Sequence, residues 1–272
     1  FSSELPGRKN MTHDRAGVWG SAQAYENYMG RWSQRIAPEF LAWLEIPPDA
    51  QWMDIGCGTG VLSSAILTRC VPRRVVGIDP TEIFVDAARS RINDLRFQCR
   101  QGSGEALPYE DNEFNVAVSG LVLNFIGDKN KAVAEMTRVV TPRGRVALYV
   151  WDYAGHMQII RYFFDTATAL DAGASAYDDA IRAPICRPGP LSRLFEAAGV
   201  ADIEVQALDI PAAFESFDDY WTPFLGGTGP GPKYCASLSP DARTRLREAL
   251  RDRLPTGPDG EILLAVRAWA IK

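Results

Sequence analysis

The strongest constraint on the fold is a glycine-rich turn, Gly56-Cys57-Gly58-Thr59-Gly60, between two apolar segments of different pattern. Residues 50–55 before the turn form a short apolar run, typical of a buried strand, and residues 61–70 after it have helical spacing. Glycine has no Cβ, so the backbone of such a turn can approach a ligand closely, and the following helix offers unpaired N–H groups. The sequence therefore predicts a strand, a turn and a helix that together hold a ligand with polar or anionic groups.

The alternation of strands and helices continues along the chain. Further apolar runs occur at 74–78, 95–99, 114–119 and 145–151, and helical patterns at 81–93 and 129–140. Two more strands are expected at 202–210 and 261–271. Strands that alternate with helices and are apolar throughout indicate a parallel sheet covered on both faces. The predicted fold class is α/β, a Rossmann-like, mostly parallel seven-stranded sheet with helices on both faces.

Other helices are expected outside this core. Residues 24–44 carry apolar and aromatic side chains at a spacing of three to four, which predicts an N-terminal helical lid. Helical patterns after the fifth strand and between the last two strands cover 157–170, 191–198, 214–225 and 240–254. The Gly/Pro-rich residues 226–232 are expected to form a connector.

This organisation predicts one domain over residues 19–272, because no linker is long enough to separate a second. Its expected parts are lid helices at 19–46, a ligand-binding core at 50–151 and helical cap insertions at 152–200 and 211–256. Residues 1–18 are expected to be a flexible N-terminal segment. Because the polar residues 1–10 precede Met11, we expect Met11 to be the natural start and residues 1–10 to be added sequence.

Composition limits the classes of partner. The five cysteines form no CxxC pair and there are two histidines, which argues against a disulfide framework or a zinc cluster. No metal is predicted, although the carboxylates of Asp128 and Asp152 could contribute to a Mg²⁺ site. A net charge of -5 provides no basic field for nucleic acid, and no run approaches the about 20 apolar residues that span a bilayer. We expect a cytoplasmic protein with a small-molecule partner, no nucleic acid and no membrane; the oligomeric state is not indicated.

An acidic residue at the end of the second strand strengthens the ligand prediction. Asp79 lies 19 residues after Gly60, where a carboxylate can accept hydrogen bonds from both ribose hydroxyls of a nucleoside. The glycine spacing is GxGxG, whereas the dinucleotide fingerprint GxGxxG needs glycine at the position of Val61. A nicotinamide-dependent Rossmann oxidoreductase is therefore the second choice.

The same segments resemble the motifs of class I S-adenosylmethionine-dependent methyltransferases of the bacterial small-molecule type. MDIGCGTG (53–60) resembles the first motif and VVGIDPT (75–81) the second. The remaining motifs are matched in order by GSGEALPY (102–109), FNVAVSGLVLNFI (114–126) and VVTPRGRVALYVW (139–151), and YENYMGRWS (25–33) is similar to the leading helix. The resemblance covers about residues 50–151 and implies S-adenosylmethionine as cofactor, with S-adenosylhomocysteine as product.

The resemblance also implies cofactor-binding residues, which are Tyr28, Arg31, Asp54, Gly56, Gly58, Gly60, Asp79, Pro80, Ser103, Gly104, Glu105, Ser119 and Leu121. It implies that the three glycines line the methionine portion, that Asp54 anchors the loop near the amino group, and that Asp79 holds the ribose. Ser103 and Gly104 would flank adenine, where a hydroxyl is a weaker, neutral partner than the carboxylate of many relatives. Ser119 and Leu121 would lie against the methionine end or the methyl donor, and Tyr28 and Arg31 above the cofactor, with Arg31 paired to its carboxylate.

Methyl transfer depends more on alignment than on acid–base power, so few catalytic residues are expected. An oxygen or nitrogen nucleophile must lose a proton, and the candidate bases near the sheet edge are Asp152, Tyr153 and His156. His156 has a suitable unperturbed pKa near 6.5. The alternatives are a surface position for His156 and a helix-capping role for Asp152.

The acceptor is expected to be a small, apolar or aromatic molecule held by aromatic residues of the lid and cap, among them Phe164 and Trp221. Oxygen, nitrogen and carbon acceptors all stay open. Enzymes that methylate base or amide nitrogens commonly carry an Asn/Asp-Pro-Pro-aromatic motif where this chain has Ser119-Gly120-Leu121-Val122. A non-catalytic cofactor-binding relative is the further alternative, because fold does not dictate function.

Overall fold

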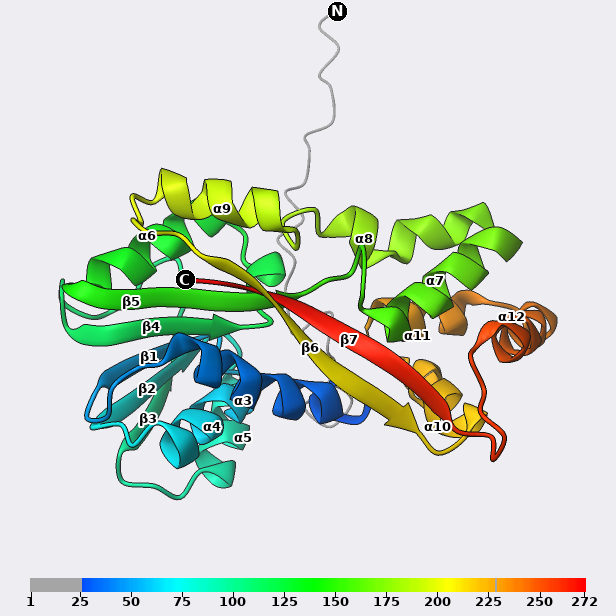
Figure 1. Cartoon of the computed structure of the whole chain (residues 1–272), viewed down its shortest axis with the longest axis horizontal. Helices are drawn as coiled ribbons and strands as arrows, with labels where there is room; N and C mark the ends of the chain where they lie inside the picture. The colour runs from blue at the N-terminus through cyan, green and yellow to red at the C-terminus, as the bar shows by residue number, and fades with distance from the viewer. Residues whose placement is uncertain (1–25, 228) are drawn as a thin grey trace, which may run out of the picture.

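The computed structural model describes residues 26–227 and 229–272. A seven-stranded sheet runs through it (Figure 1), with strands β1 (Gln51–Ile55), β2 (Arg74–Asp79), β3 (Phe97–Gln101), β4 (Phe114–Gly120), β5 (Val140–Trp151), β6 (Val205–Phe214) and β7 (Ile262–Ile271). The strand order is β3-β2-β1-β4-β5-β7-β6. The first five strands are parallel, and β7 runs antiparallel to both β5 and β6. The predicted mostly parallel seven-stranded sheet is confirmed.

Helices cover both faces of the sheet (Figure 1). On one side lie α3 (Arg31–Leu44), α4 (Val61–Arg69) and α5 (Glu82–Arg91), and on the other α6 (Lys129–Val139) and α9 (Pro188–Ala197). A π-helical turn, η1 (Glu26–Gly30), leads into α3. The predicted flexible segment 1–18 and residues 19–25 of the predicted lid lie outside the described residues.

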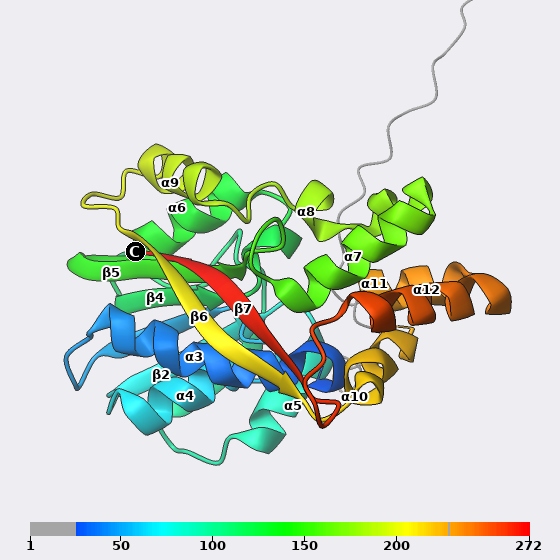
Figure 2. The same cartoon turned by 45° about the vertical axis from the view of Figure 1, so that its right-hand side comes forward.

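A 3-10 helix, η2 (Leu123–Phe125), follows β4, and the other helices form a cap beyond the carboxyl ends of β4 and β5 (Figures 1 and 2). Its members are α7 (Gln158–Leu170), the 3-10 helix η3 (Ala172–Tyr177), α8 (Asp179–Arg182), α10 (Phe217–Trp221), the 3-10 helix η4 (Thr222–Leu225), α11 (Pro230–Ser237) and α12 (Pro240–Arg253). The helix α7 packs against η3, α11 and α12. The cap is therefore made of the two insertions that the sequence predicts, one after β5 and one between β6 and β7.

Several element boundaries differ from the prediction. Part of the expected connector 226–232 is helical, because α11 begins at Pro230 and the first turn of a helix tolerates proline. The strand β5 begins at Val140, which pairs with Phe114 before an irregularity in the register. The strand β6 extends to Phe214 through Pro211, which its edge position allows.

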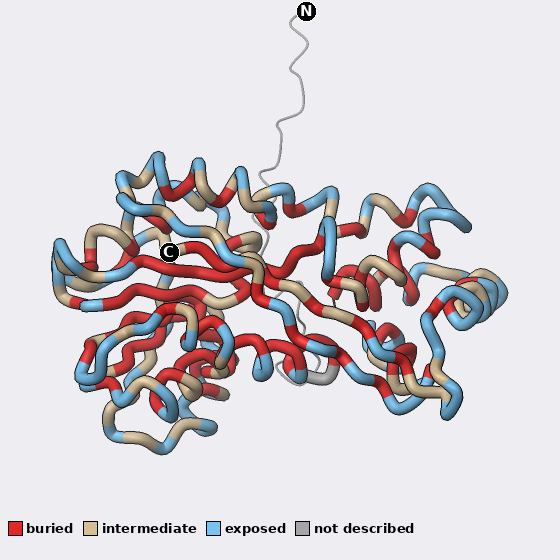
Figure 3. The backbone as a smooth tube through the Cα atoms, in the orientation of Figure 1, coloured by how far each residue is buried: buried red, intermediate tan, exposed pale blue. Residues whose placement is uncertain are grey.

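One apolar core joins the sheet to the cap. Buried residues run along the central strands and continue into the cap helices (Figure 3). The cluster includes Trp52 of β1, Tyr149 of β5 and Phe163 of α7, each with at most 2% of its surface exposed. The cap is thus packed onto the edge of the sheet at which the glycine turn lies.

Candidate functional site

The turn after β1 adopts a backbone that glycine favours at three positions. The φ angles of Gly56, Gly58 and Gly60 are +72°, +53° and +82°. The N–H groups of Gly56 and Cys57 both donate to the carbonyl of Ile78, at 2.7 and 3.0 Å. A Cβ on Gly56 would stand 2.4 Å from Cγ1 of Val122, so close packing as well as φ requires glycine there.

Asp79 holds this turn to the end of β2. Its side chain is fully buried. One carboxylate oxygen accepts from the N–H of Gly58 at 3.0 Å and the other from the N–H of Thr81 at 2.9 Å. The structure therefore brings Asp79 and the glycine turn together at the carboxyl edge of two adjacent strands, where the sequence predicts a ribose contact.

Two further predicted residues connect neighbouring elements. The Asp54 carboxylate of β1 accepts from the Ser63 hydroxyl of α4 at 2.6 Å, and both side chains are buried. The Ser119 hydroxyl of β4 donates to the carbonyl of Ile55 at 2.7 Å. Asp54 thus supports the base of the turn, and Ser119 joins β4 to β1.

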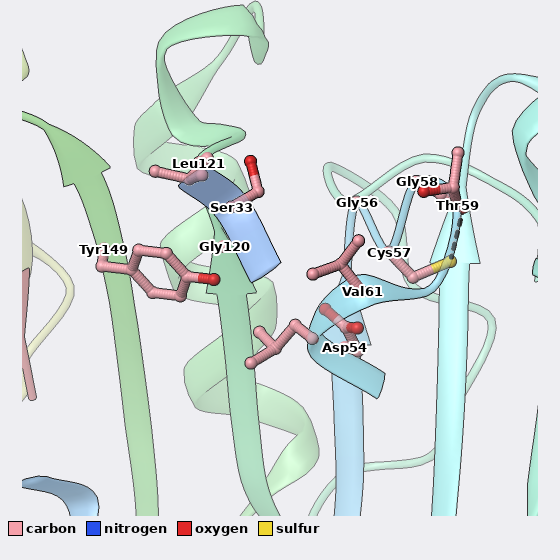
Figure 4. A pocket seen from close by; sticks show the side chains of 11 residues that line it. Ser33, Asp54, Gly56, Cys57, Gly58, Thr59, Val61, Gly120, Leu121 and Tyr149 are labelled. Atoms are coloured by element: carbon pink, nitrogen blue, oxygen red, sulfur yellow. Dashed lines mark hydrogen bonds between the residues drawn. The ribbon is translucent and has the colours of Figure 1, made fainter. Parts of the chain in front are cut away.

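A narrow pocket of about 30 Å³ opens beside the turn (Figure 4). Its walls come from α3, the turn itself, the start of α4, the end of β4 and β5. The lining residues are Ser33, Asp54, Gly56, Cys57, Gly58, Thr59, Val61, Leu62, Gly120, Leu121 and Tyr149. Four predicted cofactor-binding residues, Asp54, Gly56, Gly58 and Leu121, therefore meet in one pocket.

Tyr149 is a pocket residue that the sequence reasoning does not include. It lies opposite Gly120 in the register of β4 and β5. A Cβ on Gly120 would stand 2.7 Å from the Tyr149 hydroxyl oxygen. The next residue, Leu121, has a left-handed backbone with φ of +59°, and its N–H donates to the Tyr149 carbonyl at 2.8 Å. A glycine at the end of a strand facing a large polar aromatic is the sequence signal that could have found this contact.

Four predicted cofactor-binding residues lie outside the pocket lining: Ser103 and Gly104, which are predicted to flank adenine, and Pro80 and Glu105. The exposed Ser103 accepts the N–H of Glu105 at 3.1 Å, and the Glu105 carboxylate accepts the N–H of Asp128 at 2.9 Å. Pro80 is exposed, and its carbonyl accepts from the side chain of Gln101. A Cβ on Gly104 would stand 2.7 Å from Ile55. The adenine assignments stay predictions.

Tyr28 and Arg31 are held by protein partners. Arg31 forms an ion pair with Asp219 of α10 at 2.9 Å and also donates to the carbonyl of Ala213. Its guanidinium lies 4.5 Å from the ring of Trp32. Tyr28 is buried, with its ring edge-on to Phe224 at 5.5 Å. The structure thus engages Arg31 in joining α3 to the cap, and the predicted pairing with the cofactor carboxylate stays untested.

The three candidate bases after β5 lie outside the pocket lining. Asp152 is buried and accepts the N–H of His156 at 2.8 Å, which closes the turn before α7. His156 is exposed, and its Nδ1 lies 3.5 Å from Arg267 of β7. Tyr153 is buried in the core. The structure places Asp152 in a turn-closing contact, so its catalytic role stays a prediction, as do those of Tyr153 and His156.

Within residues 26–227 and 229–272, no three His, Cys, Asp or Glu side chains gather as a metal-ion site would require. In the same part of the chain, no helix has the length and hydropathy needed to cross a bilayer.

Comparisons with known proteins point to one family. The methyltransferase domain family matches residues 53–148. The chain is 30% identical over 112 residues to a demethylmenaquinone methyltransferase of Bacillus cereus, which is 40% of this chain and 47% of that protein. It is 33% identical over 124 residues to a 2-phytyl-1,4-naphtoquinone methyltransferase of Synechocystis, which is 43% of this chain and 51% of the relative. The chain thus spans about half the length of these two relatives.

Solved structures share the fold. The YcgJ protein of Bacillus subtilis superposes with a TM-score of 0.55 at 21% identity, over 89% of this chain and 98% of that one. A phosphoethanolamine N-methyltransferase of Haemonchus contortus, solved with S-adenosylhomocysteine, superposes with a TM-score of 0.56 at 16% identity, over 92% of this chain and 56% of that one. Residues 53–148 of this chain thus match the methyltransferase domain family, and the chain as a whole shares the fold of these solved structures.

Proposed function

We propose that this protein is an S-adenosylmethionine-dependent methyltransferase that acts on a small, apolar or aromatic acceptor. The observation that carries the proposal is the glycine turn, held by the buried Asp79 carboxylate beside a pocket at the carboxyl ends of β1 and β4. In open α/β sheets, ligands bind at this edge. We further propose, from the charge and the pocket, that the protein works in the cytoplasm on a metabolite rather than on nucleic acid.

The residues that line the pocket suit the methionine end of this cofactor in chemistry, although the pocket itself holds only about 30 Å³. Gly56 and Gly58 expose backbone without a Cβ, and the Asp54 carboxylate at the pocket wall can balance a cationic amino group or sulfonium. The side chains of Leu121 and Tyr149 line the opposite wall. A bound S-adenosylmethionine supplies an electrophilic methyl group on a positively charged sulfur.

The chain contributes to the reaction mainly by positioning. The α3 helix, the turn after β1 and the end of β4 enclose the pocket from three directions, so the reacting groups meet in a fixed geometry (Figure 4). The aromatic cap lies at the same edge of the sheet, although its rings, Phe164 and Trp221 among them, are buried in the shared core. Two relatives are named for methyl transfer to quinone-type molecules, which supports an aromatic acceptor here.

The proposal is tested by calorimetric titration with S-adenosylhomocysteine and, separately, with NAD and NADP. We expect binding of S-adenosylhomocysteine alone. The variant Asp79→Asn should bind it at least tenfold more weakly, a loss of about 1.4 kcal/mol, because the amide is a poorer acceptor for both ribose hydroxyls and backbone N–H groups. Asp86→Asn, on the exposed face of α5, is the matched control and should leave the affinity unchanged.

Binding of a nicotinamide cofactor alone would replace this proposal with the oxidoreductase alternative. Binding of S-adenosylhomocysteine without methyl transfer to any acceptor would instead identify a non-catalytic relative.

A further inference from the structure

Tyr149 of β5 is held in place by two neighbouring elements. Its side chain is 2% exposed, and its ring packs at a tilt against Phe40 of α3, with ring centroids 4.6 Å apart. Its carbonyl accepts from the N–H of Leu121, the residue that follows β4, at 2.8 Å. A side chain in a close-packed core keeps its rotamer, so the packing against α3 and β4 sets the position of the Tyr149 hydroxyl.

Gly120 at the end of β4 makes room for that hydroxyl. Gly120 is paired with Tyr149 in the sheet, and a Cβ on it would stand 2.7 Å from the hydroxyl oxygen and 2.9 Å from Cζ. Gly120 has a strand backbone without positive φ, which any residue can adopt. The close approach of the Tyr149 phenol is therefore what requires glycine here.

The phenol reaches the pocket beside the glycine turn directly. Tyr149, Gly120 and Asp54 all line this pocket. Figure 4 shows the Tyr149 hydroxyl and the Asp54 carboxylate on opposite sides of the end of β4, where Gly120 lies. Tyr149 and Asp54 thus border one cavity from two strands, β5 and β1.

The size and charge of the cavity limit which group can lie in it. A volume of about 30 Å³ is close to that of one water molecule, which is also that of a small polar group. A sulfonium with three carbon substituents is larger. The Asp54 carboxylate is 1% exposed, so a second negative charge beside it would be strongly repelled. An ammonium group suits the cavity in both size and charge.

The two side chains also supply the acceptors that an ammonium group needs. An ammonium group has three N–H donors and no acceptor. One oxygen of the Asp54 carboxylate accepts from the Ser63 hydroxyl at 2.6 Å, and a carboxylate has lone pairs for further donors. The phenol oxygen of Tyr149 has acceptor lone pairs as well. Asp54 can therefore balance the charge of an ammonium group while Tyr149 accepts one of its N–H donors.

We propose that the Tyr149 hydroxyl accepts a hydrogen bond from the α-ammonium group at the methionine end of S-adenosylmethionine, and that Tyr149 is thereby a positioning residue. This inference rests on the proposed function and assigns one contact that this function needs. Holding the ammonium group from two sides fixes the direction of the methionine chain, and with it the direction of the methyl group on sulfur. It also distinguishes the complete cofactor from an adenine nucleoside that lacks the amino group.

The first test separates the hydroxyl from the ring. Tyr149→Phe keeps the packing on Phe40 and removes only the oxygen. Its affinity is measured by calorimetric titration with S-adenosylhomocysteine and with the deamino analogue of this compound, in which hydrogen replaces the amino group. S-adenosylhomocysteine should bind about tenfold more weakly than to the wild type, because a hydrogen bond to a charged group is lost, and the deamino analogue within about twofold of the wild type. Equal weakening for both compounds, or an unchanged affinity for S-adenosylhomocysteine, overturns the proposal.

Tyr177→Phe is the matched control for the loss of a hydroxyl. Tyr177 ends η3 in the cap and is outside the pocket lining. This variant should leave both affinities within about twofold of the wild-type values. A tenfold loss of S-adenosylhomocysteine affinity in this control as well would overturn the assignment of the effect to the pocket hydroxyl.

The second test observes the phenol in the wild-type chain by NMR. Tyrosine is labelled with ¹³C at Cζ, and the Tyr149 signal is identified as the one that Tyr149→Phe lacks. Saturation with S-adenosylhomocysteine should shift this signal, because a hydrogen bond to the oxygen changes the shielding of Cζ. Saturation with the deamino analogue should produce a clearly smaller shift, and equal shifts with the two compounds would contradict the proposed contact.

The two proposals fail in different ways. If the wild-type protein does not bind S-adenosylhomocysteine, the proposed function falls, and this inference falls with it. If the wild type binds S-adenosylhomocysteine and the deamino analogue equally well, the ammonium group contributes nothing to binding. Only the role of Tyr149 then falls, and the cofactor assignment stands.

Discussion

At the scale of single residues, the turn after β1 needs glycine for two separate reasons, which two alanine variants can distinguish. Gly56 has φ of +72° and a neighbour that a Cβ would meet at 2.4 Å, whereas Gly199 has φ of +74° and no atom within 4 Å of a Cβ. Gly199→Ala should lose about 1 kcal/mol of unfolding free energy, from backbone strain alone. Gly56→Ala should lose about 2 kcal/mol more, because Val122 must move.

Urea unfolding of the two variants measures this difference. The double variant Gly56→Ala with Val122→Ala should regain part of the unfolding free energy that Gly56→Ala loses, because the smaller side chain relieves the clash. Equal losses in the two single variants would show that strain alone explains the glycine.

Asp179 should make the stability of the whole chain depend on pH. Its carboxyl has a raised pKa in the folded state, about 7 against an ordinary value of 3.8. Its contribution is therefore complete below about pH 4 and is lost as the pH rises through 7, where a buried charge must form. We expect Asp179→Asn to match the wild type in thermal midpoint at pH 4 and to exceed it by several degrees at pH 8. An advantage that is equal at both pH values would contradict this assignment.

Single residues also show how far sequence can predict the site. The spacing from Gly60 to Asp79 is a local pattern, and it correctly brings the acid to the turn, because adjacent parallel strands end at one edge. Tyr149 follows no such spacing. Its place in the pocket depends on the register of β4 against β5, and the one local sign of it is Gly120, which faces its ring. Contacts of this kind arise from tertiary packing.

At the scale of elements, two arginines join neighbouring segments under different degrees of burial. Arg161 of α7 has 15% of its side chain exposed and pairs with Asp178, which has 7% exposed. Arg31 of α3 has 42% exposed and pairs with Asp219. Arg161→Ala should reduce the unfolding free energy by about 3 kcal/mol or more, because the substitution leaves the buried Asp178 carboxylate without its partner. Arg31→Ala should lose less than about 1 kcal/mol, as exposed pairs do.

Chemical denaturation of both variants, with Arg35→Ala as a surface control, checks this order. Similar losses at Arg161 and Arg31 would mean that burial does not control the strength of these pairs.

The elements predicted best are those with strong periodicity. The core strands and the helices α4 to α6 lie within a few residues of the expected ranges, because each buries a continuous run or a regular stripe. The start of α11 at Pro230 was missed because proline and glycine end most helices, yet proline fits the first turn of one. The expected strand at 95–99 lies at 97–101, since Leu95 faces solvent instead of entering the sheet.

At the scale of the whole molecule, the shared core predicts one cooperative unfolding transition. Phe163 of the cap is fully buried and belongs to the same cluster as Trp52 of the sheet. Phe163→Ala should therefore reduce the unfolding free energy by about 3 kcal/mol. The protein should still unfold in a single calorimetric transition, with a lower midpoint temperature. Two resolved transitions, with only one shifted by the substitution, would instead make the cap an independent unit.

Ligand linkage provides a further whole-molecule prediction. S-adenosylhomocysteine at 100 times its Kd should stabilise the folded chain by about 2.7 kcal/mol, which is roughly a 5–10 °C rise in midpoint. NAD at the same concentration should produce no shift. Differential scanning calorimetry of the full chain measures both, and an equal shift with NAD would contradict the cofactor assignment.

The ribbon of β6 and β7 has a consequence for how such a protein can change. Phe214 and Ile262 are paired at its end, so the chain leaves and re-enters the sheet at points about 5 Å apart. The whole segment 215–261 is thus an insertion whose two ends are held together by the paired ends of β6 and β7. A segment of another length can join the same two paired residues, so this part of the cap can differ between relatives while the register of β6 with β7 is kept.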